Sequence, residues 1–131
     1  MKLTEPLLIC DKTSPYTGKI YPYEEVLKMV KQYNSTPLHK RYGLYVKNLA
    51  TYSVDMPLNS ISHTTDSIFL EGNHLMAEVS ILSTPEGQEV IKNIENLRLS
   101  PVISYTTDKK QKIMNMMLIR TDFVFNNRTS K

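Results

Sequence analysis

A hairpin with one fully apolar face is the feature that most restricts what this chain can fold into. Its two arms, Ser67 to Leu70 and His74 to Leu82, flank a Glu71-Gly72-Asn73 turn. Successive side chains of a strand point to opposite sides. One side of the second arm therefore carries only Leu75, Ala77, Val79 and Ile81, whereas the other side is half polar. This alternation predicts a pair of antiparallel strands with one side on a core.

Two helices are predicted on either side of this hairpin. In Tyr23 to Tyr33 the apolar residues recur at helical spacing, and Pro22 suits the helix entry. The second helix begins after Thr84, which is placed to cap it, with Pro85 at the first helical position. Its expected buried stripe is Val90, Ile91, Ile94 and Leu97.

The remaining segments complete an α+β pattern. Five further strands are expected at Leu7–Cys10, Tyr42–Val46, Arg98–Thr106, Lys112–Ile119 and Thr121–Phe125. Asn48 to Ser62 is polar and contains Pro57, which predicts a loop. Short antiparallel strands with two helices are typical of an α+β domain or a small barrel decorated by helices. We expect one domain over residues 1–131, with a flexible polar tail at 126–131.

Composition excludes several classes of protein. The single cysteine, Cys10, cannot form an internal disulfide, and no apolar run approaches the roughly 20 residues that cross a bilayer. The net charge of +3 is mild and argues against nucleic-acid binding, and Lys109 to Lys112 is expected to be a solvated hairpin turn. Without a glycine-rich phosphate loop, paired cysteines or an HExxH motif, we expect no cofactor and no metal.

Few side chains are suited to catalysis. His39 is expected in a surface loop and His74 just after an exposed turn, whereas Cys10 falls in an apolar strand and is expected in the core. His63 stands where a loop meets a strand, so it is either a polar site residue or a partly buried histidine with satisfied hydrogen bonds. Strand packing is the expected role of Met114, Met116 and Met117.

Five short motifs occur in a fixed order over about residues 7–125. They are Thr17-Gly18-Lys19-Ile20-Tyr21-Pro22 with Glu25-Val26-Leu27, then Ser62-His63 with Ile68-Phe69-Leu70-Glu71-Gly72-Asn73 and Met76-Ala77-Glu78-Val79, then Leu82-Ser83-Thr84-Pro85-Glu86-Gly87, Arg98-Leu99-Ser100, and Arg120-Thr121-Asp122-Phe123-Val124. Each motif is weak alone, but together and in this order they resemble the motifs of the prohead maturation proteases of tailed bacteriophages.

This resemblance implies a serine-protease fold related to the herpesvirus assemblins, a small and mainly antiparallel β-barrel flanked by two helices. The family's catalytic His lies in a GELNHP motif after the first helix, and its nucleophilic Ser in a GVSSRG strand. A serine hydroxyl needs an adjacent base to take its proton.

The sequence departs from the family at both places. Alignment on Gly43 puts Lys47 at the position of the base, and alignment backwards from His63 puts Ala50 there. Ser100 and Ser104 are the serine candidates by position, but Pro101 between them has no N–H to offer an oxyanion hole. We therefore expect no catalytic residues. If the chain is active, His63 would support the site, or Lys47 would act in a Ser–Lys dyad.

The resulting hypothesis is a non-catalytic virion structural protein, an auxiliary or decoration protein on the capsid shell. Its expected partner is the major capsid protein or another head protein, in many copies per virion, after synthesis in the host bacterial cytoplasm. Tyr52 and Met56 of the long loop and the N-terminal arm Met1–Glu5 are the expected contacts. One alternative is an active maturation protease that processes capsid and scaffold proteins. A second is an internal, scaffold-associated or DNA-contacting head protein.

Overall fold

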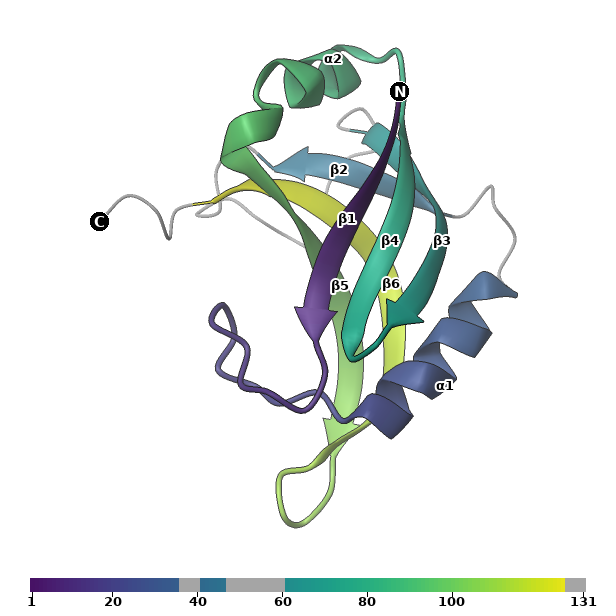
Figure 1. Ribbon diagram of the computed structural model, residues 1–131, viewed down its shortest axis with the longest axis vertical. Helices are drawn as coiled ribbons and strands as arrows, with labels where there is room; N and C mark the ends of the chain where they lie inside the picture. The colour runs from purple at the N-terminus through teal and green to yellow at the C-terminus, as the bar shows by residue number, and fades with distance from the viewer. Residues whose placement is uncertain (36–40, 47–60, 127–131) are drawn as a thin grey trace.

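The computed structural model describes residues 1–35, 41–46 and 61–126. The elements follow one another in the order β1 (Lys2–Ile9), α1 (Tyr23–Asn34), β2 (Tyr42–Val46), β3 (Ile61–Glu71), β4 (His74–Ile81), α2 (Pro85–Lys92), the short 3-10 helix η4 (Ile94–Asn96), β5 (Leu97–Thr107) and β6 (Ile113–Phe125) (Figure 1). Outside the described residues lie His39, Lys47, Ala50, Tyr52 and Met56.

The six strands form one sheet in the order β1-β4-β3-β2-β6-β5. Every neighbouring pair is antiparallel except β2 and β6, which run parallel. The sheet curls around a core and has β1 and β5 as its two edges, so it is a half-barrel (Figure 1). The expected α+β class with a mainly antiparallel sheet and two helices is confirmed, whereas a closed barrel is not what the strand order shows.

The hairpin predicted around the Glu71-Gly72-Asn73 turn forms strands β3 and β4. Its apolar row is buried throughout, and Gly72 in the turn has a φ of 63°, which glycine adopts without strain. The strand before the turn is longer than expected, because β3 begins at Ile61, within the segment predicted as a loop. That start is held by the backbone, since Leu82 N–H donates to the Ser62 carbonyl at 3.0 Å.

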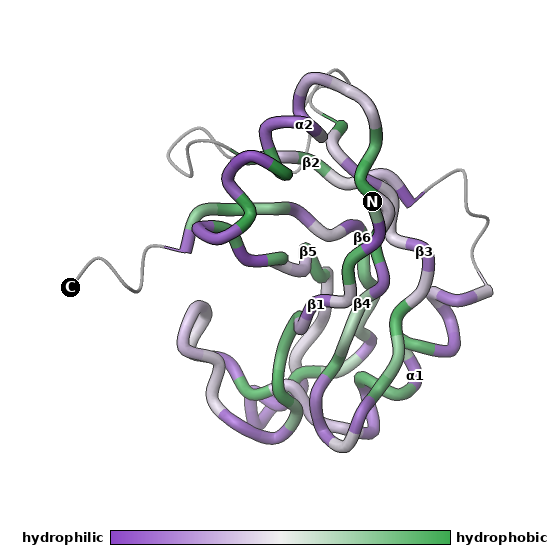
Figure 2. Tube along the Cα trace, turned by 45° about the horizontal axis from the view of Figure 1, so that its top comes forward, coloured by the Kyte–Doolittle hydropathy of each residue, from purple (hydrophilic) through white to green (hydrophobic). Residues whose placement is uncertain are grey.

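The main core lies on the inner face of the curled sheet. We use "inner face" for the side that carries Leu99, Phe123 and the apolar row of β4, and "outer face" for the side that carries Leu44 and Val124. Helix α1 packs on β3 and β6 through the side chains predicted for it, Val26, Met29, Val30 and Tyr33. Figure 2 shows that hydrophobic residues concentrate in the strands and along α1, whereas the connecting turns are hydrophilic.

Helix α2 begins as predicted but is shorter. Thr84 Oγ1 accepts a hydrogen bond from Gly87 N–H at 3.0 Å, and Pro85 occupies the first helical position. Its expected stripe is only partly right: Val90 is buried, but Ile91 is 40% exposed. The helix ends at Lys92, so Ile94 falls in η4 and Leu97 begins β5.

Two other boundaries differ from expectation. The first strand starts at Lys2 rather than Leu7, so the proposed N-terminal contact arm Met1–Glu5 is largely part of an edge strand. The two expected strands at the C-terminal end are one strand, β6, and the kink expected between them coincides with a register shift, because Val102 pairs with Arg120 but Ile103 pairs with Leu118. Met116 is buried as predicted, but Met117 is 50% exposed. Among the described residues, no helix combines the length and apolarity required for a membrane span.

Candidate functional site

Ser100 lies on the outer face, directly across the β5–β6 ladder from Asp122. Residues opposite one another in an antiparallel pair project to the same side. Leu99 and Phe123, the next pair along, are buried in the main core, so Ser100 and Asp122 must face away from it. Ser100 is half-buried, whereas Asp122 is fully buried.

Asp122 is held by a cation and by the backbone of a neighbouring strand. Arg120 Nε donates to its Oδ1 at 2.8 Å and to its Oδ2 at 3.1 Å. The Leu44 backbone N–H donates to Oδ1 at 3.2 Å. The parallel register that aligns Leu44 with Asp122 makes this last bond possible. Since a buried carboxylate is costly without partners, these bonds fix Asp122 as a structural anion between β2 and β5.

Ser104 lies in different surroundings. It is exposed, it pairs with Met117, and a register shift between Val102 and Ile103 separates it from Ser100. Pro101 sits between the two serines, opposite Thr121. Because β5 is an edge strand, the missing N–H of a proline is tolerated there. The structure therefore places the two serine candidates in separate environments and brings only Ser100 to a buried charge.

His63 lies on the inner face, away from Ser100. Its Nδ1 is 2.7 Å from Ser62 Oγ and its Nε2 is 3.0 Å from Thr121 Oγ1, and the ring meets Phe123 edge-on at 4.7 Å between centroids. Burial lowers the pKa of His63 to about 4, and a hydrogen bond to the Thr121 backbone opposes that effect. His63 is thus a fully buried histidine whose ring nitrogens both have partners on strands, whereas the second role considered for it was a partly buried histidine satisfied by the loop.

The polar network continues beyond His63, and a glycine makes room for it. Thr121 Oγ1 is also 2.8 Å from Thr65 Oγ1. A Cβ at Gly43 would lie 2.1 Å from His63 Nε2, closer than any real contact. From the sequence, a glycine within a strand indicates that another group approaches the backbone closely, but it does not identify that group as His63.

The described histidines supply no base to Ser100. His63 lies on the inner face of the sheet, opposite to Ser100, and His74 is exposed at the start of β4, as predicted. Strand β2 ends at Val46, which pairs with Val124, two residues beyond Asp122. The positions that replace the family base, Lys47 and Ala50, follow this strand end and lie outside the described residues. A Ser–Lys dyad with Lys47 therefore stays a prediction.

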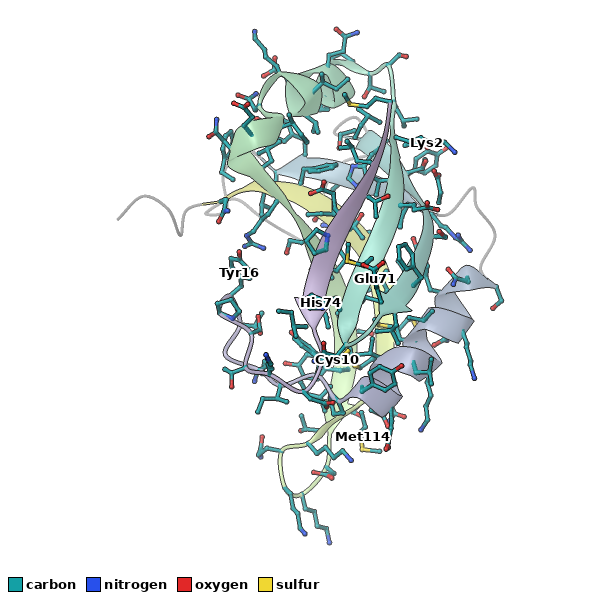
Figure 3. All side chains as sticks on the ribbon, viewed as in Figure 1. Lys2, Cys10, Tyr16, Glu71, His74 and Met114 are labelled. Carbon is teal, nitrogen blue, oxygen red and sulfur yellow. The ribbon has the colours of Figure 1, made fainter. Side chains whose placement is uncertain are left out.

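A cleft of about 400 Å³ lies where the loop after β1 meets β5. His74 lies beside the end of β1, where it pairs with Ile9, and Tyr16 lies on the loop that follows (Figure 3). The loop is tied to β5 because the Arg98 guanidinium stacks on the Tyr16 ring, 3.5 Å from its centroid. The described lining is mostly apolar, includes no Asp or Glu, and carries three basic side chains, Lys12, His74 and Arg98. Sequence reasoning missed this cleft, since Asp11 to Gly18 reads only as a turn.

Neither the Cys10 thiol nor a metal-binding cluster forms a candidate site in the described part of the chain. The Cys10 side chain is fully buried at the end of β1, as predicted, and burial raises the pKa of its thiol to about 11 (Figure 3). Within residues 1–35, 41–46 and 61–126, no group of three or more His, Cys, Asp or Glu could hold a metal ion.

Comparison with solved structures relates the fold to a capsid protease. The chain is similar to the capsid assembly protease gp21 of bacteriophage T4, with a TM-score of 0.69, 15% sequence identity, and coverage of 95% of this chain and 82% of that chain. No protein-family model matches the sequence. No curated protein matches it either. At this identity the likeness shows the fold alone: the chain has a prohead-protease-like α+β fold.

Proposed function

We propose that this chain is a non-catalytic head protein of a tailed bacteriophage, which uses a prohead-protease-like fold to bind the capsid shell. One observation carries the proposal: Ser100 and His63 lie on opposite faces of the same sheet. A serine nucleophile needs a base within hydrogen-bond reach. The fold is thus kept while the described part of the chain offers Ser100 no histidine.

The cleft beside β5 is the surface best suited to a partner. It is concave, mostly apolar and edged by cations, which are the properties of a site that binds an extended apolar segment with acidic residues nearby. Both edge strands, β1 and β5, contribute to it. The partner in this proposal is the major capsid protein or another head protein, and the chain would be present in many copies per virion. Tyr52 and Met56, outside the described residues, stay predicted contacts.

An active maturation protease is the second candidate, and it also rests on a specific observation. Ser100 lies opposite a buried Asp122–Arg120 pair, and β2 ends near it, just before Lys47. A lysine with a lowered pKa next to that serine would restore a nucleophile and base. The two candidates differ in whether Ser100 reacts.

Purified particles test the preferred function. Mass spectrometry of finished virions should find the chain in many copies, and its absence would refute the proposal. The cleft is tested by Leu8→Arg, which places a charge in its apolar lining, against Ile91→Arg on the exposed part of α2. Binding to shells assembled from the capsid protein should be lost in the first variant and retained in the second. Equal binding by both variants would show that the cleft is not the shell-binding surface.

A further inference from the structure

The tip of the β5–β6 hairpin is a second candidate surface, at the end of the molecule opposite α2 (Figure 1). The last pair of the ladder is Thr107 with Ile113, and residues 108–112 between them are all exposed. Three of these five are lysines, namely Lys109, Lys110 and Lys112. The tip therefore presents a short run of cations on a narrow two-stranded support.

Asp108 shapes this turn. Its Oδ1 accepts from the backbone N–H of Lys110 at 2.8 Å and of Lys112 at 2.9 Å. Its own N–H donates to the Lys112 carbonyl at 3.0 Å, and Gln111 adopts a φ of 66°. The carboxylate is thus engaged by backbone donors, and the turn holds the lysine backbone in a defined conformation before any ligand binds.

A fourth lysine approaches from another part of the chain. Lys19 and Lys112 line the same open pocket, of about 440 Å³, together with Gly18, Ile20, Pro22, Thr107, Gln111 and Ile113. The described lining contains no carboxylate. Two carboxylates on neighbouring segments have partners of their own: Glu25 accepts from Asn115 N–H and pairs with Lys28, and Asp11 accepts from Tyr23 N–H.

The positive charge at this corner is a local property. The described residues contain twelve Lys and Arg and twelve Asp and Glu, so this part of the chain is balanced overall. The hairpin tip and Lys19 together carry four lysines and one aspartate, Asp108. A balanced total is therefore compatible with a local cluster of cations at this corner.

We propose that this surface, Lys19 with Lys109, Lys110 and Lys112, binds the phosphate backbone of duplex DNA without sequence preference. Lysine, glutamine and threonine side chains are typical partners of phosphate oxygens, and a two-stranded ribbon is narrow enough to follow a DNA groove. An acidic protein surface fits less well, because protein interfaces are poor in lysine and all five residues of the turn, 108–112, are polar. The proposal is independent of the shell-binding cleft.

Fluorescence anisotropy of a labelled 30-base-pair duplex with the full chain tests the proposal. About four phosphate contacts predict that the logarithm of the association constant falls with the logarithm of salt with a slope of about −3 to −4. Lys109→Gln with Lys110→Gln should reduce this slope by about two and weaken binding at least about ten-fold at low salt. The matched control, Lys31→Gln with Lys92→Gln, removes the same charge from the exposed faces of α1 and α2.

Several results would overturn the proposal. They are a wild-type chain that does not bind the duplex at low salt, a salt slope weaker than about −1, or equal loss of affinity in the hairpin and control variants. If the DNA-binding proposal fails while the hairpin variant still binds capsid shells, the proposed shell-binding function is unaffected. The reverse pattern, DNA binding by a chain that does not bind shells, would refute the proposed function alone.

Discussion

Mild acid is expected to destabilise the protein through His63. Its folded-state pKa is lowered from the ordinary 6.5 to about 4, so between these values the unfolded chain binds a proton that the folded chain rejects. Stability is therefore complete above pH 6.5 and falls as the pH decreases toward 4. Integrated over this range, His63 accounts for a loss of about 2 kcal/mol between pH 7.5 and 5.0, and about 3 kcal/mol once both states are protonated.

Urea unfolding at pH 7.5 and 5.0 measures this loss. His74→Gln, which removes an exposed imidazole, is the matched control, and His63→Gln should lose about 2 kcal/mol less than this control between the two pH values. Burial raises the pKa of Glu5 and acts with the opposite sign, but all three proteins keep Glu5, so it cancels in the comparison. If His63→Gln misfolds, the pH titration of the imidazole NMR signals of the wild-type protein provides the test instead. A His63 signal that titrates near pH 6.5 would refute the reasoning.

Three further predictions follow from the buried groups. Gly43→Ala should lower the free energy of unfolding by at least about 2 kcal/mol, because its Cβ would meet His63 Nε2 at 2.1 Å; a melting temperature within error of wild type would contradict this. Asp122→Ala should cost about 3 kcal/mol in chemical denaturation, because it leaves a buried Arg120 without its carboxylate, and a neutral outcome would show that this pair is not structural. Cys10 should resist an aromatic disulfide reagent at pH 8 until urea unfolds the chain, and fast labelling of the native protein would place it at the surface.

Local patterns predicted most of the elements of the fold. The alternation of apolar residues in His74–Ile81 and their helical spacing in Tyr23–Asn34 directly indicate which face of each element is buried. The sequence indicates only the end of strand β1, because an edge strand is half exposed: Lys2, Thr4 and Pro6 face solvent, and only the last residues form an apolar run. The start of β3 was missed because polar Ser62 and His63 satisfy their hydrogen bonds inside the molecule, which composition cannot reveal.

The candidate site depended on pairings between distant segments. Ser100 could be chosen from its motif, but its place opposite Asp122 follows from the β5–β6 register, and its separation from His63 follows from which face each residue takes. A one-residue change of register would move Ser100 to the inner face. The cleft and the cationic corner are also products of the tertiary fold, since only folding brings Tyr16 against Arg98 and places Lys19 and Lys112 around one pocket.

The reactivity of Ser100 tests the central claim most directly. The full-length protein is incubated with capsid and scaffold precursors and, separately, with a fluorophosphonate that labels activated serines, followed by intact-mass measurement. The account predicts uncut precursors and no added mass for wild type, Ser100→Ala and Ser104→Ala alike. Cleavage or labelling by the wild type that is lost in Ser100→Ala or Ser104→Ala would contradict it and establish a protease.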